Sequence, residues 1–146
     1  MILIDTTPLV ALCDPQDPLH KRALRDLDQV NREPLAVCES VLSEACFLLP
    51  HPIQRKRLAR LVTDLPITWV TREADNLQGA VFAWLEKYSD HEPDWADGTL
   101  VALATQIPGA RVWTYDTEFL TTWRTLKGKR VPLFANTTRV RRSKSE

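Results

Sequence analysis

The chain opens with a short apolar run that ends in a carboxylate. Residues 2–4 are isoleucine, leucine and isoleucine, and Asp5 follows them directly. An unbroken apolar run of this kind predicts a short strand that is buried on both faces, as in a parallel sheet. In open α/β sheets, ligands bind just beyond the carboxyl ends of the strands. Asp5 is therefore the first candidate functional residue, and its role depends on whether other acids converge on it.

Strand and helix patterns alternate along the chain. Further strands are predicted at residues 35–37, 67–70, 112–114 and 131–134. Helical patterns occupy residues 8–12, 18–30, 41–49, 53–62, 71–88, 94–104 and 117–125. The connections are long enough for crossovers, so this order predicts an α/β fold with helices on both faces of a parallel sheet. Pro132 places the last predicted strand at a sheet edge, because proline cannot donate to a strand ladder.

The composition is typical of one soluble globular domain. The chain has 146 residues, of which 44% are hydrophobic and 26% charged, and this length can bury one substantial core. Nineteen basic residues balance nineteen acidic ones, so a nucleic-acid contact would have to come from a local basic patch. One patch comprises Arg55, Lys56, Arg57 and Arg60, and the other Arg139, Arg141, Arg142 and Lys144. Solvated surface is an equally good interpretation of each patch alone.

Cysteine usage and hydropathy favour a cytoplasmic protein. Cys13, Cys38 and Cys46 are far apart and in no Cys-x-x-Cys arrangement, which predicts free, reduced thiols. No basic segment precedes the first apolar run, so we expect no signal peptide. No apolar run is long enough to cross a membrane.

Other acids occupy positions that are also candidates for a functional role. Asp116 follows the fourth predicted strand, and Glu44 lies on an apolar helical face. Asp97 comes three residues after Asp94 at the start of a largely apolar helix. Helix capping and the helix dipole account well for Asp94 and less well for Asp97. Glu44 requires either a buried Arg or Lys partner or a bound cation, and the two alternatives are about even.

These acids can meet, because all strands of a parallel sheet end on one side. Gathered carboxylates raise one another's pKa values unless a cation lies among them. Ligands that offer only oxygen suit Mg²⁺ or Mn²⁺ rather than zinc. Mg²⁺ held by a few carboxylates takes phosphate oxygens as further ligands, which suits hydrolysis of a phosphodiester.

Four motifs in this order resemble those of the PIN-domain ribonucleases. They are Ile4-Asp5-Thr6-Thr7, Val41-Leu42-Ser43-Glu44, Asp94-Trp95-Ala96-Asp97-Gly98 and Trp113-Thr114-Tyr115-Asp116. The likeness extends over residues 2–134, and the chain length is similar to that of the VapC-type toxins of toxin–antitoxin pairs. The resemblance implies a PIN-like α/β/α sandwich with a central, mainly parallel sheet. We expect the PIN domain to cover residues 1–135 and a basic polar tail to cover residues 136–146.

The resemblance also implies a Mg²⁺- or Mn²⁺-dependent RNA endonuclease and names its residues. The implied catalytic acids are Asp5, Glu44, Asp97 and Asp116, with Asp94 as an additional acid. The same four acids are the implied metal ligands, Asp5 and Asp97 foremost. Thr6 and Thr114 match supporting hydroxyls that orient a carboxylate or a phosphate, and RNA contact would fall to Arg55, Lys56, Arg57 and Arg60. The family further implies a homodimer and a small antitoxin whose C-terminal segment covers the groove.

Two rival interpretations remain, and one departure from the family pattern needs an explanation. A phosphatase of the haloacid-dehalogenase type needs a second acid two residues after the first, where Thr7 stands. A PIN-like module that binds RNA or protein without cleaving it usually lacks one of the acids, and none is missing here. Gly98 stands where a small helix former is usual, and it should weaken its helix by up to about 1 kcal/mol relative to Ala.

Overall fold

The computed structural model describes residues 1–70 and 77–134, and its centre is a parallel sheet. The strands are β1 (Ile2–Ile4), β2 (Leu35–Cys38), β3 (Ile67–Val70) and β4 (Arg111–Trp113). They lie in the order β3-β2-β1-β4, and every neighbouring pair is parallel. The predicted α/β class with a central parallel sheet is confirmed.

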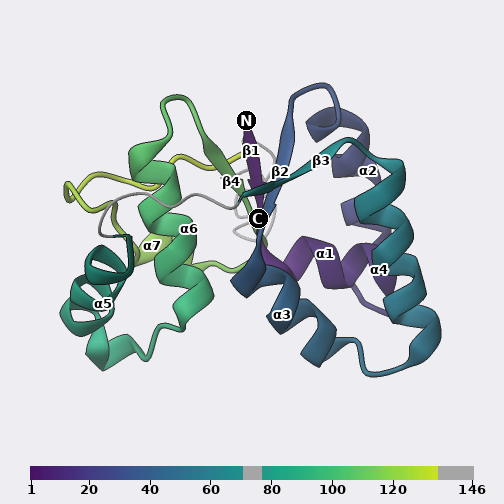
Figure 1. Ribbon diagram of the computed structural model, residues 1–146, viewed down its shortest axis with the longest axis horizontal. Coiled ribbons are helices and arrows are strands. Elements are labelled where there is room, and N and C mark those ends of the chain that lie inside the picture. The colour runs from purple at the N-terminus through teal and green to yellow at the C-terminus, as the bar shows by residue number, and fades with distance from the viewer. Residues whose placement is uncertain (71–76, 135–146) are drawn as a thin grey trace, which may run out of the picture.

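Helices cover both faces of the sheet and form an α/β/α sandwich (Figure 1). On one side lie α1 (Thr6–Cys13), α2 (His20–Val30) and α4 (Pro52–Asp64). On the other side lie α5 (Leu77–Lys87) and α6 (Trp95–Gln106), with the 3₁₀ helix η1 (Ser89–His91) between them in the chain. Helix α3 (Glu39–Leu48) follows β2 and packs against both α1 and α6, and the short α7 (Glu118–Thr121) follows β4.

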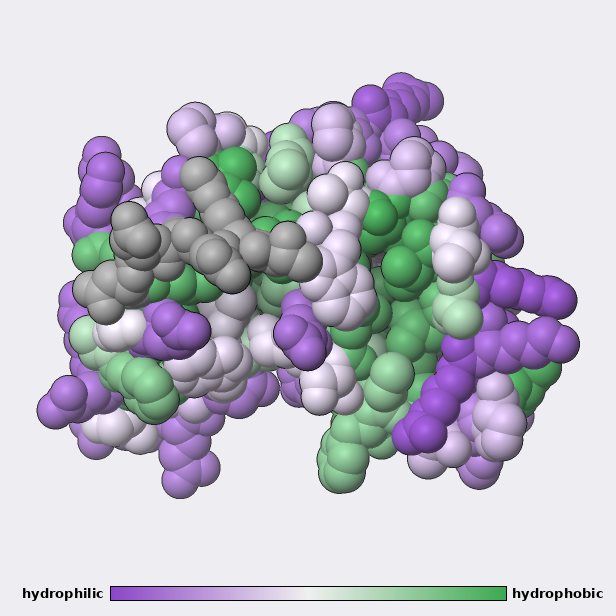
Figure 2. Space-filling model, viewed as in Figure 1, coloured by the Kyte–Doolittle hydropathy of each residue, from purple (hydrophilic) through white to green (hydrophobic). Residues whose placement is uncertain are grey.

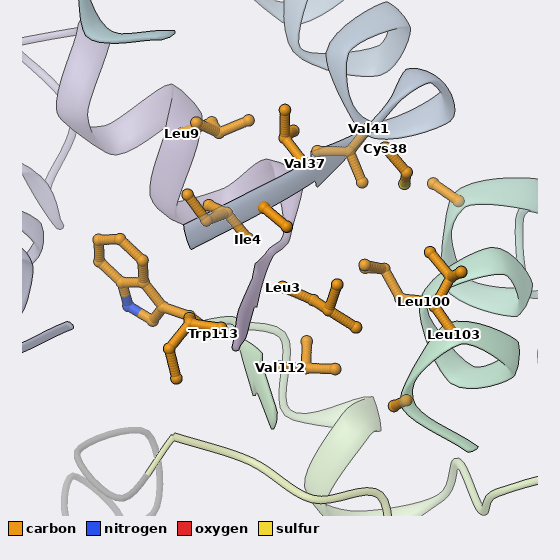
Figure 3. Close-up of a cluster of buried hydrophobic side chains, with 14 of the residues drawn as sticks. Leu3, Ile4, Leu9, Val37, Cys38, Val41, Leu100, Leu103, Val112 and Trp113 are labelled. Carbon is orange, nitrogen blue, oxygen red and sulfur yellow. The ribbon is translucent and has the colours of Figure 1, made fainter. Parts of the chain in front are cut away.

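Strand β1 is buried on both faces, as its uniform apolar run predicts. Leu3 points toward Leu100 and Leu103 of α6, whereas Ile4 points toward Leu9 of α1 (Figure 3). No residue of β1 is more than 1% exposed. Successive side chains of a strand point to opposite faces, so a strand with helices on both sides needs apolar residues at every position.

The junction between β1 and α1 has no loop. The backbone N–H of Asp5 donates to the Trp113 carbonyl oxygen (2.9 Å), and Asp5 Oδ1 accepts a bond from the Thr6 N–H (2.7 Å) as the N-cap of α1. Because Asp5 caps the helix, α1 begins at Thr6, earlier than the turn predicted over residues 8–12. Pro8 is tolerated because N–H groups in a first helical turn have no partner within the helix.

Two elements near the end of the described chain are shorter than predicted. The helix expected over residues 117–125 is reduced to α7, because Trp123 turns into the core at 2% exposure and packs edge-on against Trp84 of α5 (centroids 5.1 Å apart). Residues 131–134 form only an isolated parallel bridge to Val112. The Val112 N–H donates to the Pro132 carbonyl oxygen (2.8 Å), so this segment does lie at the sheet edge beside β4.

The structure also bears on the helix predicted over residues 71–88 and on the state of the cysteines. The helix predicted over residues 71–88 is present as α5, while residues 71–76 and the basic tail predicted over residues 136–146 lie outside the described residues. All three cysteines are free thiols, as expected. In the described part of the chain, no helix combines the length and the apolar character needed to cross a bilayer.

Gly98 has a packing role that its low helix propensity does not suggest. A Cβ atom at this position would lie 2.8 Å from Val81 Cγ1 and 3.3 Å from Trp84 Cε3, both on α5. The first distance is shorter than any ordinary contact between carbon atoms. The missing side chain therefore allows α5 and α6 to approach closely, and the expectation that Gly98 merely weakens its helix was incomplete.

We expect Gly98→Ala to lower the melting temperature even though alanine is the better helix former. The propensity gain is about 1 kcal/mol, whereas overpacking a core costs about 1–3 kcal/mol, and the β-branched Val81 has little rotamer freedom in a helix. Thermal denaturation of the single variant and of the double variant with Val81→Ala would measure this effect. Val81→Ala opens a cavity when made alone, so it should cost less stability in the Gly98→Ala background than in the wild type. A single variant that melts above the wild type would refute the close-packing explanation.

Candidate active site

The acids singled out in the sequence lie at one edge of the sheet. Asp5 closes β1, Asp116 follows β4 by three residues, Glu44 lies in α3, and Asp94 and Asp97 stand at the start of α6. In Figure 1 the carboxyl ends of β1 and β4 face the N-terminal ends of α1, α3 and α6 at the lower side of the sheet. The predicted convergence at the strand ends therefore has a structural basis.

Asp5 is the most deeply buried of these acids, at 4% exposure. Its Oδ1 accepts a bond from the Thr6 N–H (2.7 Å), and its Oδ2 accepts one from Thr114 Oγ1 (2.6 Å). Burial raises the pKa of Asp5 to about 7; the two hydrogen bonds oppose the rise, and the charges of Asp116 and Glu44 add to it. Asp5 is thus held in one orientation while its charge remains poorly compensated.

Glu44 is half-buried and bonded to a hydroxyl rather than to a cationic side chain. Its Oε2 accepts a bond from Thr6 Oγ1 (2.9 Å). Burial raises the pKa of Glu44, the Thr6 bond opposes the rise, and the carboxyls of Asp94 and Asp116 raise the pKa further. Within the described residues, no Arg or Lys forms an ion pair with Glu44. The described residues therefore supply no basic partner for Glu44, which was one of the two alternatives for this acid, the other being a bound cation.

Asp94 and Asp97 form a reciprocal cap at the start of α6. The Asp97 N–H donates to Asp94 Oδ1 (2.8 Å), and the Asp94 N–H donates to Asp97 Oδ2 (3.2 Å). Capping therefore uses both acids, which is more than we expected for Asp97. Burial, then the charge of Asp94, then those of Asp5 and Asp116 raise the pKa of Asp97 to about 8. The carboxyl of Asp97 is thus affected by the charges of Asp5 and Asp116, which follow two strands, as well as by that of Asp94, its partner in the cap.

Two threonines join the acids to one another through hydrogen bonds. Thr114 Oγ1 donates to Asp5 Oδ2 (2.6 Å) and accepts a bond from the Asp116 N–H (3.0 Å). Thr6 connects Asp5 to Glu44, because its N–H donates to the first acid and its hydroxyl to the second. The two hydroxyls hold acids from different elements in register.

A polar network behind the site was missed by the sequence reasoning. Thr7 Oγ1 accepts a bond from the Tyr115 N–H (2.9 Å), and the Tyr115 hydroxyl donates to Asp26 Oδ2 of α2 (2.7 Å). The guanidinium of Arg22 lies 4.4 Å from the centre of the Tyr115 ring. Helix α2 therefore anchors the segment that carries Asp116. The available signal was Asp26 itself, a carboxylate one helical turn from the apolar Ala23 and Val30.

The donor chemistry of the site suits a hard divalent cation. The acids offer only oxygen, and in residues 1–70 and 77–134 none of them pairs with a basic side chain. No three Asp, Glu, His or Cys side chains in those ranges stand as a ready-made ion-binding group. Asp94 and Asp97 each spend one oxygen on the cap, and Asp5 spends both of its oxygens on hydrogen bonds. The charge of the acids and their oxygen donors therefore suit a cation, although the carboxylates do not surround a single point.

The raised pKa values link the stability of the metal-free protein to pH. An acid whose pKa is higher in the folded state binds its proton more tightly there, so it stabilises the fold fully below its ordinary pKa of 3.8. This stabilisation is lost as the pH rises through about 7 for Asp5 and about 8 for Asp97. Protonation at low pH removes the cost of burying these carboxylates as charged groups beside one another, and above pH 8 the metal-free fold bears that cost in full.

The predicted RNA-contact cluster does not adjoin the acids. Its members, Arg55, Lys56, Arg57 and Arg60, are exposed on α4, at the outer side of the molecule (Figure 1). Arg55 donates to the carbonyl oxygens of Leu49 and Cys46 (both 2.9 Å) and so caps the end of α3. Arg57 makes a longer bond to the Cys13 carbonyl oxygen at the end of α1 (3.5 Å). Two of the four side chains thus have structural partners, and their contact with RNA stays a prediction.

We expect Thr114→Val to reduce both stability and Mn²⁺ affinity, because this near-isosteric change leaves Asp5 Oδ2 and the Asp116 N–H without their shared partner. Loss of a hydrogen bond to a charged group costs about 1.5–3 kcal/mol. Chemical denaturation and calorimetric Mn²⁺ titration would measure the two effects. Thr114→Ser keeps the hydroxyl and serves as the matched control. If the valine variant equals the wild type in both measurements, the hydroxyl does not position the acids.

The comparisons with known proteins agree with this architecture. Residues 2–122 match the PIN domain family. Among solved structures, the fold is similar to that of the Mycobacterium tuberculosis toxin VapC20, described as cleaving the sarcin-ricin loop, at 22% sequence identity and a TM-score of 0.61. That match covers 83% of this chain and 95% of the toxin chain. Among curated proteins, no sequence matches. The family match covers most of the chain, and this protein belongs to the PIN domain family.

Proposed function

We propose that this protein is a metal-dependent endoribonuclease that hydrolyses phosphodiester bonds of RNA and acts as the toxin of a toxin–antitoxin pair. The observation that carries the proposal is that Asp5, Glu44, Asp94, Asp97 and Asp116 lie at one sheet edge, where burial and, after it, the charges of neighbouring acids raise the pKa values of Asp5, Glu44 and Asp97. Membership of the PIN domain family and the likeness to VapC20 support RNA as the substrate.

The cation requirement follows from the charge of the site and of its substrate. A phosphodiester is an anion, and unshielded carboxylates would repel it. Asp5, Asp97, Glu44 and Asp116 would hold Mg²⁺ or Mn²⁺, with Asp94 beside them. When bound, such an ion polarises a phosphoryl oxygen and lowers the pKa of a coordinated water. Water then suffices as the nucleophile, so the site needs no nucleophilic side chain.

The residues of the chain contribute orientation. Asp5 cannot rotate freely, because Thr6 and Thr114 each hold one of its oxygens. The reciprocal cap of Asp94 and Asp97 uses one oxygen of each acid and leaves the other for a ligand. Groups fixed in this way do not have to be ordered when the substrate binds, which is the usual source of a large part of the catalytic effect.

The proposal extends to partners and location. Resemblance to the VapC-type toxins supports a homodimer, a small cognate antitoxin and a cytoplasmic location. Phe47 (80% exposed), Leu48 (49%) and Ile53 (54%) leave apolar side chains in water at the turn between α3 and α4, and Figure 2 shows an apolar projection over the end of α3. Exposed apolar patches are typical of protein contact sites. A PIN-like module without activity is the weaker alternative, because all five acids are present.

The test is cleavage of a mixed pool of tRNA and rRNA by the purified protein. We expect discrete fragments with Mn²⁺ or Mg²⁺ and none with EDTA. Asp97→Asn keeps an oxygen for the cap and should lower the rate more than about a hundredfold, because losing a group that merely supports a metal ligand already costs about 10- to 100-fold. Asp64→Asn, an exposed acid at the end of α4, is the matched control and should cleave as the wild type does.

Two outcomes would count against the proposal. Cleavage that survives both EDTA and Asp97→Asn would mean that the acids are not the catalytic site. A folded protein that binds Mn²⁺ and RNA yet leaves every RNA in the pool intact would favour the binding module.

A further inference from the structure

Two partly exposed aromatic side chains lie at the start of α6 and on the adjacent α5. Trp95 is the first residue of α6, directly after Asp94 and two residues before Asp97. It is 38% exposed, and Phe82 of α5 is 64% exposed. The two rings meet edge-on, with centroids 4.9 Å apart and planes at 64°. Large aromatic rings gain by burial, so this exposed pair beside a polar site requires an explanation.

We propose that Trp95, supported by Phe82, is the surface on which a base of the RNA stacks when the neighbouring phosphate lies at the acids. This inference rests on the proposed ribonuclease function and adds a positioning site to it. Trp95 lies in the same first turn of α6 as Asp94 and Asp97, and its ring is turned toward Phe82 of α5. The edge contact from Phe82 restrains the indole ring while leaving more than a third of the Trp95 residue surface open.

Charge favours a base over a further phosphate at this position. The first turn of α6 carries no basic side chain, and the charge of Asp94 and Asp97 would be offset by the bound cation, so this surface offers a further phosphate no cationic partner. The basic side chains of α4 that could attract the backbone lie on the far side of the sheet from α6 (Figure 1). A base is uncharged and has a flat face, and stacking on an aromatic side chain contributes about 1–3 kcal/mol per base without regard to sequence. Stacking can therefore supply affinity where charge does not.

The chain offers a matched control for this surface. Trp69 is 45% exposed on β3. It is an exposed aromatic residue outside the helix start that carries Asp94 and Asp97. If exposure alone favoured RNA binding, Trp69 would contribute as Trp95 does. The proposal requires that only the pair beside the acids contributes.

The experiment compares two probes of equal length, a short oligouridylate and the same ribose-phosphate chain without bases. Binding is measured with Ca²⁺ in place of Mn²⁺, and a gel verifies that the probes stay intact. Trp95→Ala should weaken binding of the oligouridylate by about 5- to 150-fold, the equivalent of one stacked base. It should leave binding of the base-free chain unchanged. Trp95→Phe should retain part of the affinity, and Phe82→Ala should lose part of it.

Two further measurements separate stacking from a structural role. Calorimetric titration of Trp95→Ala should give the wild-type Mn²⁺ affinity, because the acids remain in place. Trp69→Ala should bind both probes as the wild type does.

Three results would overturn the inference. They are equal losses on both probes, no loss on either probe, and a loss accompanied by a lower assembly mass in light scattering, which would assign the pair to a protein interface. Failure here is distinct from failure of the proposed function. A wild type that cleaves RNA while Trp95→Ala keeps full affinity leaves the ribonuclease intact and removes the stacking site. A wild type that neither binds the oligouridylate nor cleaves RNA removes both.

Discussion

The site depends on one buried carboxyl, that of Asp5. This group ends β1, caps α1 and accepts a bond from Thr114 beyond β4, so it joins the sheet, a helix and a second strand end at one point. Such a position is costly, because burial raises the pKa of Asp5 to about 7. A fold that needed only a cap there could use an uncharged residue such as serine. The retained acid, with other acids gathered around it, indicates a site built to receive positive charge.

Stability and chemistry are carried by the same groups at this edge. Asp94 and Asp97 satisfy the first N–H groups of α6 and also present carboxylates to the site. Thr6 and Thr114 bond the acids and at the same time hold α1 and the chain after β4 in place. Removal of any one group therefore disturbs both fold and site, and Asn or Ser replacements that keep the hydrogen bonds separate the two effects.

The acids could be identified in the sequence because the topology of a parallel sheet determines which strand ends meet. Once the alternation of strands and helices indicates a parallel sheet, residues such as Asp5 and Asp116 that follow strands must share an edge. The sequence showed the carboxylate of Asp26 but not its partner Tyr115, and it gave no indication of the close approach of Gly98 to Val81. Both contacts depend on how segments far apart in the chain pack together, and neither produces a periodic pattern in the sequence. The capping role of Arg55 was hidden for the same reason.

The most direct test of convergence is to count the protons released when Mn²⁺ binds. Calorimetric titration of the metal-free protein in buffers of different ionisation enthalpy gives this number. Because burial raises the pKa values of Asp5 and Asp97 to about 7 and 8, binding at neutral pH should release between one and two protons per site, and the release should vanish well above pH 8. Asp97→Asn should reduce it. Binding at neutral pH with no proton release would contradict the convergence of these acids on one cation.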